Sequence, residues 1–306
     1  MPFIPRFKGT DLVCTKMEEK SIKSHDNVRI TYFKYGLDPK EAPTLILLQG
    51  AFGVNHTIFN DYIPFLQRDY SVIAPDLRGE GKSQKLTELH ESSLELEDFA
   101  LDVKLIMEKE KIKKATLIGV SAGGKIALKC ADMFQKRFDA LILISSSYNF
   151  LETTKPIYRF LEKTGISDYI IGEVIYSLWP LFISNHTRKL STYTDFSKLD
   201  KSRIKREMLA SVSNIDRRTH TMVTKASRKV RRWNLKGVLE KINILCYFIT
   251  GKKDKLVLPE ASYTMAEIIP NSEVTIIPSG NHQMILTQPK EIYEAMQKYL
   301  SKIYKN

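Results

Sequence analysis

Short apolar runs alternate along the chain with segments in which apolar residues recur at helical spacing. Short runs bounded by polar residues are typical of buried strands. We expect such strands at residues 44–49, 71–74, 115–120, 139–145, 243–250 and 273–278. Between two of them, apolar positions such as Leu96, Phe99 and Val103 predict a helix that lays one face on a sheet.

Both ends of this pattern are also informative. Residues 18–35 predict an antiparallel hairpin whose turn is His25-Asp26-Asn27, and residues 290–303 predict a closing helix. Strands that alternate with helices predict an α/β fold, with a mostly parallel central sheet flanked by helices.

The alternation breaks between residues 150 and 236, where the pattern indicates several helices. We interpret this stretch as a helical cap inserted into the core. The predicted organisation is a first part of the core at residues 1–150, a cap insertion at 151–235 and a second part of the core at 236–306. Residues 151–240 carry 18 Lys and Arg against 9 Asp and Glu, a balance of +9 out of the chain's +12.

The segment Gly119-Val120-Ser121-Ala122-Gly123 follows one apolar run and opens a helical pattern. A serine between two such glycines fits a sharp strand-to-helix turn that exposes its hydroxyl, the G-x-S-x-G nucleophile elbow. We therefore take Ser121 as the candidate nucleophile.

Asp254 and His282 each follow the end of a predicted strand, in Gly251-Lys252-Lys253-Asp254 and Ser279-Gly280-Asn281-His282. Loops at the carboxyl ends of parallel strands converge on one site. A serine needs an imidazole that takes its proton, and the imidazole needs a carboxylate that orients it. Ser121, His282 and Asp254 supply these three roles.

An earlier loop, Gln49-Gly50-Ala51-Phe52-Gly53, follows the apolar run from Leu45 to Leu48 and can present a backbone N–H. The N–H groups of Ala51 and Ala122 are the candidate oxyanion hole. In measured cases each such donor contributes about 3 kcal/mol.

The segment Pro75-Asp76-Leu77-Arg78-Gly79-Glu80-Gly81-Lys82-Ser83 is similar to the P-D-x-R-G-x-G-x-S loop of the α/β-hydrolase superfamily. With the elbow, the chain resembles a capped member of that superfamily over residues 18–150 and 236–306. The resemblance implies the α/β-hydrolase fold, a Ser121–Asp254–His282 triad and oxyanion donors at Ala51 and Ala122. Where the family usually has His-Gly, this chain has Gln49-Gly50, so we expect altered hydrogen bonding in that loop without loss of the oxyanion hole.

Composition narrows the remaining classes. The only cysteines are Cys14, Cys130 and Cys246, without paired spacing, so we expect neither disulfides nor a zinc site, and no metal or cofactor. The N-terminus lacks the apolar stretch of a signal peptide, and no 18-residue apolar span occurs. We expect a cytoplasmic protein without an integral membrane segment or a nucleic-acid partner; the sequence leaves its oligomeric state open.

Several features leave alternatives open. The basic cap is either a solvated surface or one that steers an acidic partner, such as an acyl carrier protein, a coenzyme A thioester or an anionic membrane surface. Trp179 and Phe182 either floor an acyl pocket or belong to the core of the cap. His56 lies close to the oxyanion segment in sequence, and we interpret it as capping a loop or facing solvent rather than as lining the pocket.

The sequence predicts a serine hydrolase, first of all a carboxylesterase, that cleaves a small ester through an acyl-enzyme. A thioesterase acting on an acidic carrier or coenzyme A uses the same apparatus. So do a lactonase, a prolyl aminopeptidase, a carbon–carbon bond hydrolase and an acyltransferase. A ligand receptor or interaction protein on the same fold, without turnover, is the alternative of another class.

Overall fold

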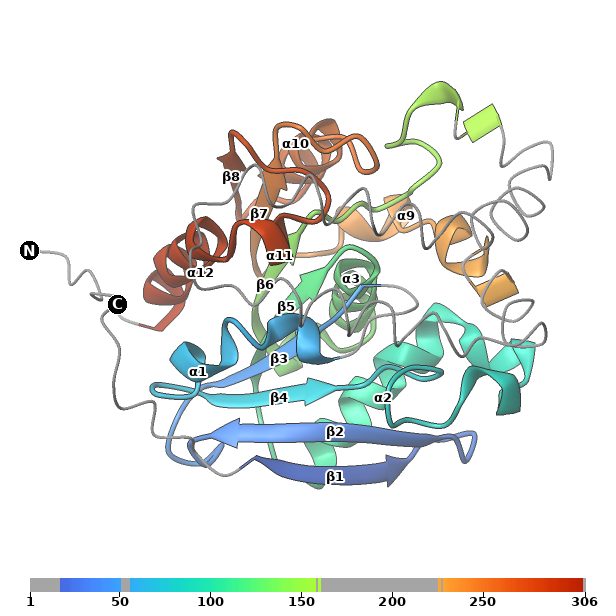
Figure 1. The fold of residues 1–306 in the computed structure, drawn as a ribbon, viewed down its shortest axis with the longest axis vertical. Helices are drawn as coiled ribbons and strands as arrows, with labels where there is room; N and C mark the ends of the chain where they lie inside the picture. The colour runs from blue at the N-terminus through green and yellow to red at the C-terminus, as the bar shows by residue number, and fades with distance from the viewer. Residues whose placement is uncertain (1–16, 51–55, 158, 161–224, 227, 305–306) are drawn as a thin grey trace, which may run out of the picture.

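The computed structural model describes residues 17–50, 56–157, 159–160, 225–226 and 228–304. An eight-stranded sheet crosses its centre in the order β1-β2-β4-β3-β5-β6-β7-β8 (Figure 1). The strands are β1 (Glu18–Lys23), β2 (Arg29–Gly36), β3 (Thr44–Leu48), β4 (Ser71–Pro75), β5 (Ala115–Val120), β6 (Phe138–Ile144), β7 (Leu245–Gly251) and β8 (Ser272–Ile277).

The strands β3 to β8 are parallel to one another, and β2 runs antiparallel to both β1 and β4. The α/β fold with a mostly parallel sheet is therefore confirmed. The β1–β2 hairpin turns at Asn27, whose φ of 65° lies in the left-handed region that asparagine tolerates.

Helices cover both faces of the sheet. The α-helices of the described core are α1 (Ile63–Leu66), α2 (Leu96–Lys109), α3 (Ala122–Phe134), α9 (Lys236–Leu239), α10 (Glu260–Ile268), α11 (Met284–Thr287) and α12 (Pro289–Tyr304). Short 3₁₀ turns are η1 (His56–Phe59), η2 (Leu86–Glu88), η3 (Glu91–Leu94) and η4 (Gln135–Arg137).

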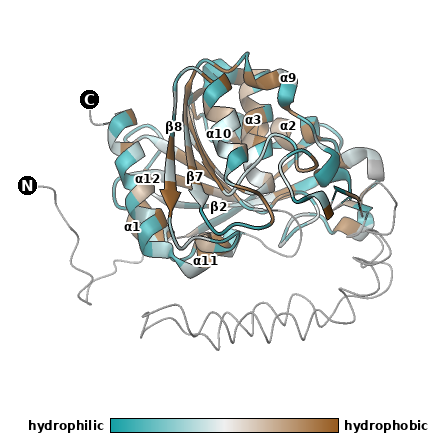
Figure 2. Ribbon diagram, turned by 90° about the horizontal axis from the view of Figure 1, so that it is seen from above, coloured by the Kyte–Doolittle hydropathy of each residue, from teal (hydrophilic) through white to brown (hydrophobic). Residues whose placement is uncertain are grey.

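Two hydrophobic cores lie on opposite faces of the sheet, because successive strand residues point to opposite sides. In β3, Ile46 packs into the core that contains α2, α3, α9 and α10, whereas Leu47 packs into the core that contains α1, α11 and α12. In Figure 2 hydrophobic colour follows the central strands, and hydrophilic residues gather on the helices around them. The sheet is thus fixed on both faces, which gives the loops at its edge a rigid base.

The stretch predicted as a cap leaves and rejoins the core at neighbouring points. Asn149 and Asn234 form an antiparallel bridge, and the Leu235 N–H donates to the Tyr148 carbonyl at 2.9 Å. Helical residues occur at 156–157 and 159–160 and again at 225–226 and 228–232. Most of 151–235 lies outside the described residues, so the cap and its boundaries stay a prediction.

Candidate active site

Ser121 stands in the turn between β5 and α3. Its φ of 51° is rare for a residue other than glycine, so the turn is strained. Its N–H donates to the Ile144 carbonyl of β6 at 2.8 Å, which holds the strained residue at the end of the sheet. A Cβ at Gly119 would lie 2.5 Å from the Gly123 carbonyl oxygen, and one at Gly123 would lie 2.2 Å from that of Leu48. Close backbone packing therefore requires both glycines.

The structure brings the three predicted side chains into one line of hydrogen bonds. Ser121 Oγ lies 3.2 Å from His282 Nε2, and His282 Nδ1 lies 2.9 Å from Asp254 Oδ2. The Asp254 carboxylate is fully buried, and the His282 side chain is 22% exposed. This exposure leaves room beside the imidazole for a reacting molecule. The order serine, imidazole, carboxylate is the one that proton transfer from the hydroxyl requires.

Asp254 is fixed by backbone donors from its own loop. Its Oδ1 accepts from the N–H groups of Leu256 and Val257, both at 2.9 Å. Oδ2 is thereby left for His282. The carboxylate can hold the imidazole with Nδ1–H toward itself and Nε2 toward the serine.

Backbone contacts join the loop of Asp254 to the loop of His282. The Lys253 N–H donates to the Gly280 carbonyl at 2.8 Å. A Cβ added at Gly251 would lie 2.5 Å from Gly280 backbone atoms, and one at Gly280 would lie 2.8 Å from the Gly251 Cα. These two glycines let the ends of β7 and β8 approach closely, a role that the sequence pattern did not reveal.

Ala122 is buried at the first turn of α3, where backbone N–H groups lack partners within the helix. Ala51 lies outside the described residues, so its role stays a prediction. Gln49, which is fully buried, fixes the start of the predicted oxyanion loop, residues 49–53. With its amide oriented to satisfy the backbone, Nε2 donates to the Pro75 carbonyl and Oε1 accepts from the Leu77 N–H, both at 2.8 Å.

The other end of that loop is anchored by Asp76. Its Oδ1 accepts from the His56 N–H at 3.0 Å and lies 2.7 Å from His56 Nδ1, while Oδ2 accepts from the Lys82 N–H at 2.8 Å. Gly81 has a φ of 50°, and a Cβ there would lie 2.1 Å from Asp76 Oδ2. His56 thus caps a loop, the first of its two interpretations.

Ser146 is a further residue that the sequence pattern did not single out. Its Oγ donates to the Ser121 carbonyl at 2.8 Å, and Gly124 leaves the space that this contact needs. Its position just past the end of β6, beside the strand that carries Ser121, was the available signal.

The buried thiols offer no second nucleophile. Burial raises the pKa of Cys246 to about 12 and raises that of Cys130 beyond the usual range. Neither thiol forms the reactive thiolate at neutral pH. Cys14 lies outside the described residues.

A narrow, mainly apolar pocket lies beside Ser121. It is lined by Gly50, Leu77, Phe99, Ala122, Ile126, Val230 and Trp233, and also by Arg78 and Glu80. Gly50 and Ala122 place it next to the predicted oxyanion position. Trp179 and Phe182, which the sequence offered as the floor of an acyl pocket, lie outside the described residues, so that interpretation stays a prediction.

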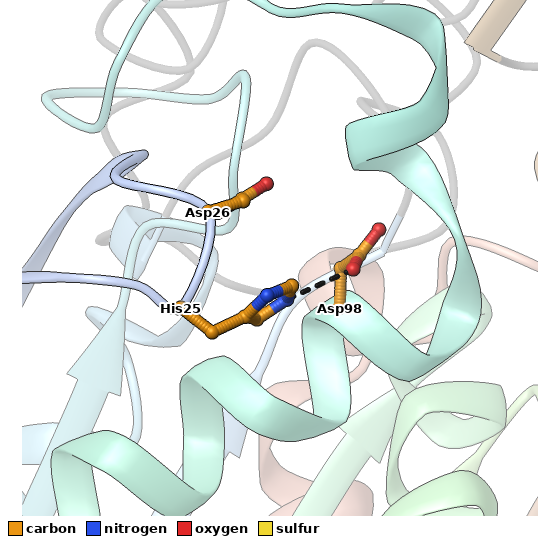
Figure 3. Close-up of side chains that lie close together, drawn as sticks. All are labelled: His25, Asp26 and Asp98. Carbon is orange, nitrogen blue, oxygen red and sulfur yellow. Dashed lines mark hydrogen bonds and ion pairs between the residues drawn. The ribbon is translucent and has the colours of Figure 1, made fainter.

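His25, Asp26 and Asp98 form the one group of three metal-ligand side chains found within the described residues (Figure 3). Their acceptors are already engaged. His25 Nε2 lies 3.0 Å from Asp98 Oδ1, Asp98 Oδ2 accepts from the Glu95 N–H at 2.9 Å, and Asp26 Oδ2 accepts from Arg78 Nη1 at 2.9 Å. The buried Arg78 guanidinium supplies the positive charge here, and the group ties the hairpin turn to α2.

Comparison with known proteins identifies the family. The family model of the alpha/beta hydrolase fold matches residues 43–289. The chain belongs to the alpha/beta hydrolase fold family. Its predicted fold and the resemblance in its sequence are thereby confirmed, and it is an enzyme of the alpha/beta hydrolase type. Within the described residues, no helix is both long and apolar enough to cross a bilayer.

Individual members of the alpha/beta hydrolase family are similar at low identity. A putative carbamate hydrolase, RutD, of Pseudomonas syringae is 22% identical over 266 residues, which cover 85% of this chain and 95% of that protein. A 3-oxoadipate enol-lactonase of Acinetobacter baylyi is 21% identical and spans 87% of this chain and 91% of its own length. The structure of an esterase from Exiguobacterium antarcticum aligns with a TM-score of 0.73 at 21% identity, covering 93% and 100% of the two chains.

Proposed function

We propose that the protein is a serine hydrolase that cleaves carboxylic esters through an acyl-enzyme. The observation that carries this proposal is the continuous hydrogen-bonded line from Ser121 through His282 to the buried carboxylate of Asp254. A strained serine whose hydroxyl lies within hydrogen-bond distance of an imidazole nitrogen is typical of nucleophilic catalysis.

In the first half of the reaction, Ser121 Oγ attacks the ester carbonyl carbon while His282 Nε2 takes the hydroxyl proton. Asp254 stabilises the imidazolium that forms. The carbonyl oxygen becomes negatively charged and is held by the N–H groups of Ala122 and Ala51. The carbon–oxygen bond to the leaving group then breaks, and His282 gives its proton to the departing alkoxide.

In the second half, water replaces the alcohol next to His282. The imidazole takes one water proton as the water oxygen attacks the acyl carbon. The bond to Ser121 Oγ breaks, and the serine recovers its proton from His282. The products are one alcohol and one carboxylic acid, and the enzyme is regenerated without a metal or cofactor.

The similar proteins support this reaction class without selecting a substrate. Their names include an esterase, an enol-lactonase and a carbamate hydrolase, all of which cleave bonds at a carbonyl carbon. We place carboxylesters first because most of the side chains that line the pocket are apolar, with Arg78 and Glu80 as the charged exceptions, and such a lining suits an uncharged acyl group.

A second candidate function rests on the charge of the chain. The balance of +9 in residues 151–240 favours a substrate whose acyl group is carried as a thioester on an acidic protein or on coenzyme A. The same residues would cleave that thioester. The carrier would be a partner of the cap, and the small esters would be surrogate substrates.

The proposal is tested by a substrate panel of p-nitrophenyl esters, acyl thioesters, lactones and prolyl amides, run with the parent and with Ser121→Ala. We expect many turnovers of ester, and a loss of at least about 10³-fold in kcat for Ser121→Ala. A fluorophosphonate probe should label Ser121 in the parent alone. Hydrolysis by Ser121→Ala within about tenfold of the parent would exclude the assigned nucleophile. Consumption of one equivalent without turnover would favour a receptor.

A further inference from the structure

Lys125 is a buried side chain that the proposed reaction does not use. It lies on α3, one helical turn after Ser121, and is 4% exposed. Its Nζ donates to the backbone carbonyls of Val230 and Trp233, both at 3.2 Å. Val230 and Trp233 belong to the return segment, residues 228–235, through which the chain rejoins the core.

The two carbonyls lie at the carboxyl end of the helical residues 228–232. The Val230 carbonyl also accepts from the Trp233 N–H at 3.3 Å. Lys125 adds a second donor to that carbonyl and supplies a donor to the Trp233 carbonyl. Within the described part of the chain, no carboxylate pairs with Lys125. The lysine therefore acts on the backbone of the return segment and not on an acidic side chain.

An apolar side chain at position 125 would avoid the cost of burying an amine. Burial lowers the pKa of Lys125 from 10.5 to about 7, which reflects that cost. Lys125 donates hydrogen bonds to two backbone carbonyls. An apolar residue of similar length would have no donor for them.

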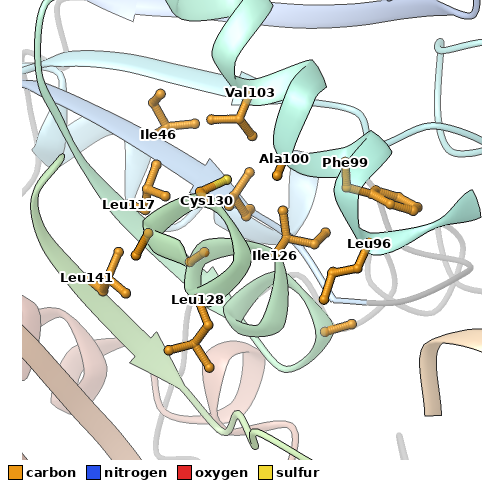
Figure 4. Packing of buried hydrophobic residues seen from close by; sticks show 14 of the residues in the cluster. Ile46, Leu96, Phe99, Ala100, Val103, Leu117, Ile126, Leu128, Cys130 and Leu141 are labelled. Carbon is orange, nitrogen blue, oxygen red and sulfur yellow. The ribbon is translucent and has the colours of Figure 1, made fainter. Parts of the chain in front are cut away.

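The same segments line the pocket near Ser121. Ala122 and Ile126 of α3 contribute to its lining, and so do Val230 and Trp233 of the return segment. Phe99 of α2 also lines it and meets the Trp233 ring edge-on, with centroids 5.4 Å apart. Figure 4 shows Ile126 on α3 and Phe99 on α2, beside the core on which both helices pack.

Sheet order indicates which part of an ester enters this pocket. Asp254 and His282 follow β7 and β8, whereas Gly50 and Leu77 of the pocket follow β3 and β4, on the other side of β5. The leaving group must lie by His282, which protonates it. The acyl group therefore points away from His282, toward the part of the pocket lined by Gly50 and Leu77. The return segment lines the same pocket from beside the end of β6.

We propose that Lys125 is a positioning residue that holds the return segment against α3 and so limits the pocket to short apolar acyl groups. The acyl assignment rests on the proposed ester hydrolysis, but the contact of Lys125 with the return segment does not. Because Nζ contacts the backbone at both Val230 and Trp233, its loss should loosen this part of the lining, while the Asn149–Asn234 bridge and the Lys229–Glu95 pair still tether the segment.

The test compares Lys125→Met with Lys129→Met. Methionine keeps an unbranched apolar chain and removes the donor. Lys129 lies one turn further along α3 and pairs with Glu97 and Asp132, so it controls for loss of a lysine from the same helix. Both substitutions are made in the parent and in a Trp179→Phe background. The chain has two tryptophans, so in that background Trp233 is the only one left.

The first measurement is the kcat and KM for p-nitrophenyl esters from acetyl to octanoyl. In Lys125→Met the ratio of kcat/KM for hexanoyl over acetyl should rise at least about fivefold, mainly through KM for the longer ester. The kcat for acetyl ester should stay within about twofold. Lys129→Met should keep the parent's chain-length profile.

The second measurement is quenching of Trp233 fluorescence by acrylamide, which needs no enzymatic activity. Quenching should increase in Lys125→Met and stay unchanged in Lys129→Met. Unchanged quenching in Lys125→Met would overturn the positioning role. Increased quenching with an unchanged chain-length profile would overturn the control of acyl length. A parent without esterase activity would overturn the proposed function and the acyl pocket, while the quenching would still decide the role of Lys125.

Discussion

Two glycines determine how closely the carboxylate and the imidazole of the candidate site approach. Gly251→Ala would place a methyl group 2.5 Å from Gly280 backbone atoms, and backbone cannot yield as a flexible side chain would. We expect a loss of about 1–3 kcal/mol in the free energy of unfolding. Because His282 would shift relative to Ser121, kcat should fall by about 10². Urea denaturation and ester kinetics on the same preparation measure both effects.

Gly237→Ala is the matched control for this prediction. A Cβ at Gly237, in α9, meets nothing within 4 Å. Alanine also favours a helix over glycine by about 1 kcal/mol, so this variant should be at least as stable as the parent and fully active. Equal stability and activity in the two variants would mean that the contact between Gly251 and Gly280 is not needed.

At this scale, the sequence was sufficient to place Ser121, Asp254 and His282 together, because each follows a strand of one parallel sheet. Their catalytic roles stay predictions. The contacts of Gly251 with Gly280 and of Lys125 with the return segment could not be foreseen, and for Ser146 only its position past the end of β6 was a signal. Each depends on how two elements distant in sequence pack, and no periodicity or spacing encodes that distance.

At the scale of an element, α3 begins at the candidate nucleophile and carries a buried titrating side chain, Lys125, one turn later. Burial lowers the pKa of Lys125 to about 7 in the folded protein, from 10.5. Between these pH values the unfolded state binds more protons, so the free energy of unfolding should rise with pH. The gain is complete above pH 10.5 and is lost as pH falls toward 7. The slope should approach about 1.4 kcal/mol per pH unit.

Lys125→Met isolates this contribution from other groups. The charged side chains of the return segment, Arg228, Lys229, Arg231 and Arg232, stay the same in both proteins. Urea denaturation from pH 6.5 to 9.5 should show the parent gaining stability relative to Lys125→Met as pH rises. A constant difference between the two proteins over that range would contradict a buried amine that loses its proton.

The elements themselves were largely predictable. The hairpin at 18–35, the apolar face of α2 and the parallel strands all follow from period and polarity, and the structure confirms them. Residues 151–235 were harder to interpret because their apolar positions do not alternate with strands. Apolar periodicity there indicates helices but not the surface on which they pack.

At the scale of the whole molecule, charge is distributed unevenly. Residues 151–240 hold +9 of the chain's +12, so the remainder is close to neutral. Part of this charge is engaged, since Lys229 Nζ lies 2.5 Å from Glu95 Oε1. This ion pair holds the return segment to the start of α2. Lys229 therefore has a structural role in addition to its contribution to the positive electrostatic field.

The two candidate substrates differ in how their capture depends on that field. An acidic carrier approaches through long-range attraction, which salt screens, whereas a neutral ester does not. Raising salt from about 50 to 500 mM shortens the Debye length from roughly 14 to 4 Å, and kcat/KM for an acyl carrier thioester should fall severalfold while that for a neutral ester stays constant. Arg232→Glu should reproduce part of this selective loss, and Lys136→Glu, the same charge change in η4, should not. Equal salt dependence for both substrates would leave the basic residues as a solvated surface and simple esters as the substrates.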